Sequence, residues 1–172
     1  HPYGLHMPPS DRAPRPYKRK GEWDKEAKRA GNFKGTIQAM CELIDNSLEE
    51  DAENITIVVQ VDTIRRGNVQ SVYVADDGNG MTPDVLHEAV CENAGTRMER
   101  RVKRTHGRRK LGKYGVGLPL ASSTQCDRWK VISWKDAEPK EAFSCGIDWN
   151  DGSFIQEQMV NYPVSEPAPE DL

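Results

Sequence analysis

The chain has 172 residues, of which 36% are hydrophobic and 30% charged, and its formal net charge is −3. This size fits one domain, and the composition excludes a chain that is disordered throughout. The sequence has no apolar run of the roughly 18–20 residues that cross a membrane, which excludes a transmembrane protein, and it has no charged-then-apolar leader. Its four cysteines lack CxxC spacing, which excludes a zinc knuckle. Together these features predict a cytoplasmic protein.

Residues 1–30 are expected to lie outside the core. Residues 1–7 are typical of a vector-derived tag remnant, with Met7 as the natural start. Residues 8–20 hold four prolines among several basic residues, which predicts a basic, Pro-rich arm. Residues 22–30 are predicted to form a short polar helix that ends at Gly31.

Residues 34–50 give the strongest helix prediction. Apolar side chains recur there at helical spacing and predict one core-facing stripe: Ile37, Met40, Cys41, Ile44 and Leu48. A second, polar stripe is spaced by four residues: Gln38, Glu42 and Asn46. Alternating hydrophobicity then predicts strands over 54–61 and 69–75, joined by a turn at 66–68.

The second half of the chain carries weaker signals. Thr82 as the cap and Pro83 at the first position predict a helix to about Glu92. Residues 93–110 are basic and aperiodic, which indicates a long functional loop or lid. A helix is predicted from 118 to 123, strands at 129–134 and 142–147, and a weaker strand at 154–160. An acidic, Pro-rich tail is expected over 161–172.

Three short motifs could carry chemistry, and each has an ordinary structural alternative. Glu42 and Asn46, one helical turn apart, could polarise water and hold a hard cation, or could be the wet side of an amphipathic helix. Asp76 ends a strand before two glycines, where it could accept a hydrogen bond from an exocyclic amine or form a plain Asp-Gly turn. The G-x-x-G-x-G segment at 112–117 could offer backbone N–H groups to an anion.

Together these motifs resemble the Bergerat-fold ATPases. This family joins DNA gyrase, the ninety-kilodalton heat-shock chaperone, sensor histidine kinases and MutL, and it shows the same order of E-x-x-D-N on a helix, D-x-G-x-G-M after a strand, a lid, and G-x-x-G-x-G. The resemblance covers about residues 31–147, and Glu42 places the chain nearer the chaperone, MutL and Morc branches. It implies an α/β two-layer sandwich, with a mixed, mostly antiparallel sheet and helices on one face.

The resemblance also implies a role for each motif residue. Glu42 matches the general base that activates water, and Asn46 matches the Mg²⁺-binding asparagine. Asp76 matches the aspartate that accepts a hydrogen bond from adenine. The remaining residues implied to bind ATP are Gly78, Gly80 and Met81, then Asn93 and Thr96 at the start of the lid (93–111), then Gly112, Lys113, Tyr114, Gly115, Val116 and Gly117.

The expected function is therefore Mg²⁺-dependent ATP binding and hydrolysis by a domain at 31–160, used as a conformational switch. The resemblance implies ATP-driven homodimerisation through residues 8–30, and a larger protein of which this chain is the N-terminal part. One alternative is a nucleotide-gated module that binds DNA, or a protein partner not identified here, with little hydrolysis. It is suggested by the basic arm and by the eight Lys and Arg residues of 97–110. The other is histidine-kinase-type phosphotransfer, for which His87 and His106 are expected to be plain surface residues.

Overall fold

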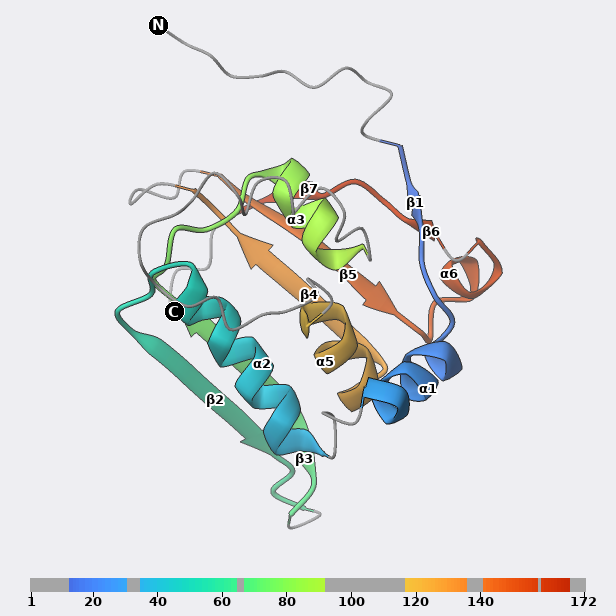
Figure 1. Ribbon diagram of the computed structural model, residues 1–172, viewed down its shortest axis with the longest axis horizontal. Helices are drawn as coiled ribbons and strands as arrows, with labels where there is room; N and C mark the ends of the chain where they lie inside the picture. The colour runs from blue at the N-terminus through green and yellow to red at the C-terminus, as the bar shows by residue number, and fades with distance from the viewer. Residues whose placement is uncertain are drawn as a thin grey trace, which may run out of the picture.

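Helices and antiparallel strands form an α/β arrangement, which confirms the predicted fold class (Figure 1). The computed structural model describes residues 13–30, 35–64, 67–91, 117–135, 141–157 and 159–167. The elements are β1 (Arg15–Pro16), α1 (Lys20–Ala30), α2 (Thr36–Glu49), β2 (Ile55–Val61), β3 (Val69–Asp76), α3 (Pro83–Val90), α5 (Gly117–Gln125), β4 (Arg128–Ser133), β5 (Ala142–Asp148), α6 (Gly152–Glu157), β6 (Met159–Val160) and β7 (Val164–Glu166).

Within the described residues every strand pairing is antiparallel. The strands form three small sheets, β1–β6, β2–β3 and β4–β5–β7. The two strands predicted at 129–134 and 142–147 are β4 and β5, and they pair from Arg128 with Asp148 to Ser133 with Phe143. The predicted strands at 54–61 and 69–75 are β2 and β3, which form a hairpin.

The core lies between the helices and the β4–β5 sheet. Helices α3 and α5 lie across this sheet, and α1 and α2 both contact α5 (Figure 1). The buried apolar side chains that cluster together in this core are Tyr17, Trp23, Leu86, Val90, Cys91, Leu120, Cys145, Ile147 and Val160. In the part of the chain that the structure describes, no helix is long and apolar enough to cross a membrane.

The N-terminal segment contributes to this core from Arg15 onward. Strand β1 pairs with β6, and Tyr17 is only 5% exposed, with its hydroxyl 2.9 Å from Ser123 Oγ on α5. Trp23 in α1 is completely buried and stacks at 5.3 Å from the Tyr17 ring. The prediction that residues 8–20 lie outside the core is therefore wrong for Tyr17. The many prolines and basic residues of the segment predicted an exposed arm, and they outweighed the single aromatic residue Tyr17. Burial of one large side chain stabilises the folded state by about 1.5–3 kcal/mol.

The C-terminal predictions also need correction. The weak strand expected at 154–160 is helix α6 followed by the two-residue strand β6. Asp151 favours the helix because its side chain accepts a hydrogen bond from Ser153 N at 2.9 Å. The expected tail contains β7, which pairs with β5, and Ser144 Oγ donates to Glu166 at 3.0 Å across this pair.

Helix α3 begins as predicted, with Pro83 in its first turn and Thr82 Oγ1 accepting from Val85 N at 3.5 Å. His87 on this helix is 1% exposed, and its Nε2 lies 3.1 Å from the carbonyl oxygen of Val160. The expectation that His87 is a surface residue is wrong. Burial is the main cause that lowers the pKa of His87 below its ordinary value.

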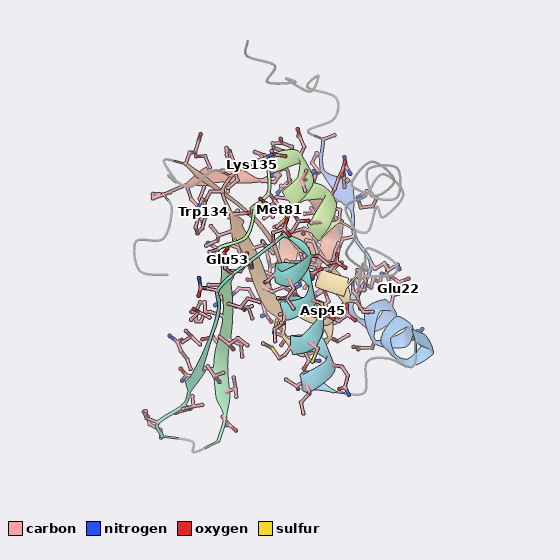
Figure 2. All side chains as sticks on the ribbon, turned by 60° about the vertical axis from the view of Figure 1, so that its left-hand side comes forward. Glu22, Asp45, Glu53, Met81, Trp134 and Lys135 are labelled. Atoms are coloured by element: carbon pink, nitrogen blue, oxygen red, sulfur yellow. The ribbon has the colours of Figure 1, made fainter. Side chains whose placement is uncertain are left out.

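Helix α2 buries a different face from the one its apolar stripe predicted. Its buried residues are Ala39 and Ser47, whereas Ile37 is 77% exposed. Helix α2 packs against α5 and also contacts β3, where Ser47 Oγ donates to Asp76, so these neighbouring elements and not the apolar stripe determine which face is covered. The hairpin β2–β3 projects beside α2, and its aliphatic side chains, such as Val61 at 54%, remain largely exposed (Figure 2).

Candidate functional site

Helices α2 and α5 bring the first and third sequence motifs into contact. A Cβ placed on Gly117 would lie 2.6 Å from Oε2 of Glu42, so the carboxylate lies directly against the first residue of α5. Any larger residue at position 117 would displace Glu42. The polar stripe of α2 therefore reaches a helix–helix contact and is not wholly in solvent.

Glu42 has the electrostatics of a proton acceptor. Its pKa is raised above the ordinary value of 4.5, first by burial and then by the negative charges of Asp45 and Glu49. A carboxylate with a raised pKa takes a proton from water more readily than an ordinary surface glutamate. The neighbours of Glu42 on its own helix thus strengthen it as a base.

Asn46 lies one turn further along α2. Its Nδ2 is buried and has no hydrogen-bond partner in the described part of the chain. A buried amide without a partner costs about 1–3 kcal/mol, so such a group is typical of a position that a ligand completes. The described residues contain no group of three or more His, Cys, Asp or Glu side chains that could hold a metal ion by themselves.

Asp76 ends β3 and is held by two hydrogen bonds. Ser47 Oγ donates to Asp76 Oδ2 at 2.9 Å, and the backbone N of Gly78 donates to Asp76 Oδ1 at 3.0 Å. Each carboxylate oxygen has two lone pairs, so both retain capacity for a ligand donor. The contact with Ser47 joins the second motif to α2, only one residue from Asn46.

The two glycines of the second motif are required by close backbone approach. A Cβ on Gly78 would lie 2.8 Å from the carbonyl oxygen of Glu50. Gly80 has a φ of 64°, and a Cβ there would overlap the carbonyl oxygen of Trp134. Met81 follows, with its backbone N donating to Ser133 Oγ at 2.8 Å and its side chain packed against the core. Figure 2 shows Met81, Trp134 and Lys135 gathered where β4 ends.

A comparison with protein families identifies the family of this chain. Residues 35–168 match the family model described as histidine kinase-, DNA gyrase B- and HSP90-like ATPase. The chain belongs to this family. No curated protein matches the chain. The α/β arrangement of helices and antiparallel sheets is consistent with the fold of this ATPase family, whose domains bind ATP, generally with Mg²⁺, and generally hydrolyse it.

Part of the predicted ATPase site lies outside the described residues. This holds for the lid at 93–111 and for the sequence-predicted residues Asn93, Thr96, Gly112, Lys113, Tyr114, Gly115 and Val116. Among the predicted site residues that the structure describes, Glu42 on α2 contacts Gly117 at the start of α5. Asp76 at the end of β3 is hydrogen-bonded to Ser47, the residue after Asn46 on α2.

Sequence reasoning missed three polar residues at the site. Ser47 follows Asn46 directly and bonds Asp76. Asp77 and Asn79 lie inside the second motif and bond the loop that follows α2. Their polar character within a glycine-rich turn was the available signal, but turn residues of this kind usually bond their own loop.

Proposed function

We propose that this ATPase-family chain binds ATP together with Mg²⁺ and hydrolyses it, and that the cycle acts as a conformational switch. The observation that most supports hydrolysis is the Glu42 carboxylate, with its raised pKa, against Gly117 at the start of α5. The same residue supports a place nearer the chaperone, MutL and Morc branches.

The proposed chemistry uses the chain's own groups in order. Asp76 accepts a hydrogen bond from the exocyclic amine of adenine, and the backbone of 112–117, of which Gly117 is described, wraps the triphosphate. Glu42 orients a water and takes its proton as the water oxygen bonds to the γ-phosphorus. The bond from that phosphorus to the β–γ bridging oxygen breaks, and ADP leaves.

The residues present fit a magnesium ion held mainly by the nucleotide. Mg²⁺ is usually bound through one or two protein oxygens together with phosphate oxygens and water. Asn46 has the buried, unpartnered amide that such an arrangement would complete, because rotation of the amide presents its oxygen at the same place. Asn46 would be the residue of this chain that holds the cation, and the charge that the cation supplies would neutralise the phosphates.

We propose water as the phosphoryl acceptor, and the one histidine among the described residues, His87, does not compete with it. His87 is 1% exposed and bonded to the Val160 carbonyl, so it is not accessible to a phosphoryl group.

We also propose dimerisation on ATP binding. Tyr17 and Trp23, within the segment expected to mediate it, are buried in the chain's own core, so any dimer contact there would use other residues. A mass by light scattering that stays monomeric with a non-hydrolysable ATP analogue would contradict dimerisation.

Binding and turnover test the proposal separately. ATP is titrated with Mg²⁺ against the wild type and Asp76→Asn, and phosphate release is followed for the wild type, Glu42→Gln and the control Glu157→Gln, an exposed glutamate on α6. We expect Asp76→Asn to lose binding. Glu42→Gln should bind and release phosphate about 10²–10⁴-fold more slowly, the range for loss of a general base. Equal phosphate release by Glu42→Gln and Glu157→Gln would refute the role of Glu42.

A further inference from the structure

We propose that Asp77 and Asn79 are positioning residues that hold Asp76 against α2 and thereby set the preference for the adenine base. This inference rests on the proposed function, because it assumes that Asp76 accepts a hydrogen bond from the adenine amine. It concerns two loops that meet beside Asp76: the α2–β2 loop, residues 50–54, and the β3–α3 loop, residues 77–82.

Asp77 joins the two loops through its carboxylate. Its Oδ1 accepts from the backbone N of Glu53 and of Asn54, both at 2.8 Å, and its Oδ2 accepts from Asn54 Nδ2 at 2.7 Å. The backbone N of Asp77 donates in return to the Asn54 carbonyl at 3.3 Å. Hydrogen bonds from Asn54 are the main cause that lowers the pKa of Asp77. The charged form, to which these bonds are strongest, is therefore the one present at neutral pH.

Asn79 makes a second connection two residues later. Its backbone N and its Nδ2 both donate to the Glu50 carbonyl, at 2.9 and 3.0 Å, and Nδ2 also lies 3.3 Å from Asp51 Oδ2. Asp51 has a φ of 63°, a left-handed conformation that is uncommon for a residue other than glycine. Between the two connections, the backbone of Gly78 lies so close to the Glu50 carbonyl oxygen that a Cβ at position 78 would be 2.8 Å from it. The loops are thus joined over several consecutive residues.

These bonds matter because the other contacts near Asp76 are few: β3 contacts α2, and the backbone of Gly80 and Met81 contacts the end of β4. Among the described strands, β2 and β3 pair only with each other. Most aliphatic side chains of the hairpin are about half-exposed, as Val59 at 50% illustrates, so apolar packing contributes less to its position than it does for the core strands. Asp76 is the last residue of this hairpin. Its distance from α2, which carries Glu42 and Asn46, therefore depends on the paired loops and on Ser47.

The test compares the affinities for ATP and for inosine triphosphate, in which a carbonyl replaces the adenine amine. The wild type should prefer ATP. In Asp77→Ala and Asn79→Ala this preference should fall about tenfold, the usual cost of losing a residue that orients a ligand-binding group. Asp77→Asn, whose side-chain oxygen still accepts from both backbone N–H groups, should retain most of the preference. Asp151→Ala is the matched control, because Asp151 is also exposed and bonds backbone in its own loop, beside α6.

Each result decides between the two hypotheses. An unchanged preference in Asp77→Ala and Asn79→Ala, with the wild type preferring ATP, overturns the positioning role alone. A wild type that binds neither nucleotide, or both equally, refutes the proposed role of Asp76 and the positioning role with it. If the melting temperatures of Asp77→Ala and Asp151→Ala fall equally but only Asp77→Ala loses the preference, the effect comes from positioning and not from general loss of stability.

Discussion

Replacing Gly80 with alanine tests how the second motif is packed. Gly80 has a φ of 64°, in the left-handed region, and its α-carbon faces the backbone of Trp134 at the end of β4. The added methyl group would overlap the Trp134 carbonyl oxygen and lie 2.8 Å from the carbonyl carbon. Both are backbone atoms of a strand-end residue, which cannot move aside as a flexible side chain can.

The expected loss of folding free energy in Gly80→Ala is the sum of a conformational cost and a steric cost. The left-handed conformation costs a residue with a Cβ about 1–2 kcal/mol. Forcing a methyl group into occupied space costs about 1–3 kcal/mol more. For a chain of this size each 1 kcal/mol lowers the melting temperature by about 2–4 °C. A loss of about 3 kcal/mol therefore predicts a fall of about 6–12 °C for Gly80→Ala.

Thermal unfolding followed by tryptophan fluorescence measures this, and two glycines serve as controls. Gly67 has a φ of 96° but nothing within 4 Å of its Cβ position, so Gly67→Ala should show the conformational cost alone, a fall of about 2–8 °C. Gly21 lies in α1 with open space around it, so Gly21→Ala should leave the melting temperature unchanged or raise it. If Gly80→Ala were no worse than Gly67→Ala, the close approach to Trp134 would be wrong.

Three further predictions concern titratable groups. Because the folded-state pKa of Glu42 is raised, its contribution to stability is lost as pH rises from 4.5 through that pKa, so Glu42→Gln should melt higher than the wild type at pH 7; an equal or lower melting temperature would contradict this. Because the folded-state pKa of His87 is lowered, stability is present above about pH 6.5 and lost as pH falls; urea unfolding at pH 7.5 and 5.5 should show a smaller difference for His87→Gln than for the wild type. Cys41 is exposed, whereas burial raises the pKa of the other three thiols, to about 12 for Cys91 and Cys145. One thiol per chain should therefore react rapidly with a disulfide reagent, and this rapid reaction should disappear in Cys41→Ser. Rapid reaction of a second thiol would refute the burial of the other three.

Local sequence patterns located most elements to within one or two residues. The helix predicted over 34–50 is α2 at Thr36–Glu49, and the strand predicted over 129–134 is β4 at Arg128–Ser133. Helical and strand periodicity, proline position and capping act between residues that are neighbours in the chain. The motifs also predicted the family correctly, because their residue types and order can be recognised in the sequence without a structure.

Contacts between distant residues decided what the patterns did not predict. Tyr17 is buried among side chains that are distant in the chain, and its hydroxyl lies 2.9 Å from Oγ of Ser123, more than a hundred residues away. Ile37 is exposed although it belongs to the predicted apolar stripe, whereas Ala39 and Ser47 on the same helix are buried. An amphipathic pattern says that a helix has an apolar face, but the neighbouring elements determine which face is covered.

The sequence by itself determined the α/β class and the family, because these depend on residue type and spacing, and it predicted Glu42, Asn46 and Asp76 as site residues. Only the tertiary structure decided that Glu42 lies against Gly117 and that Ser47 bonds Asp76. It also decided that hydrogen bonds join the loop after α2 to the loop after β3. Such contacts depend on the close packing of helices and loops that are far apart in the chain, and no local pattern encodes the resulting distances.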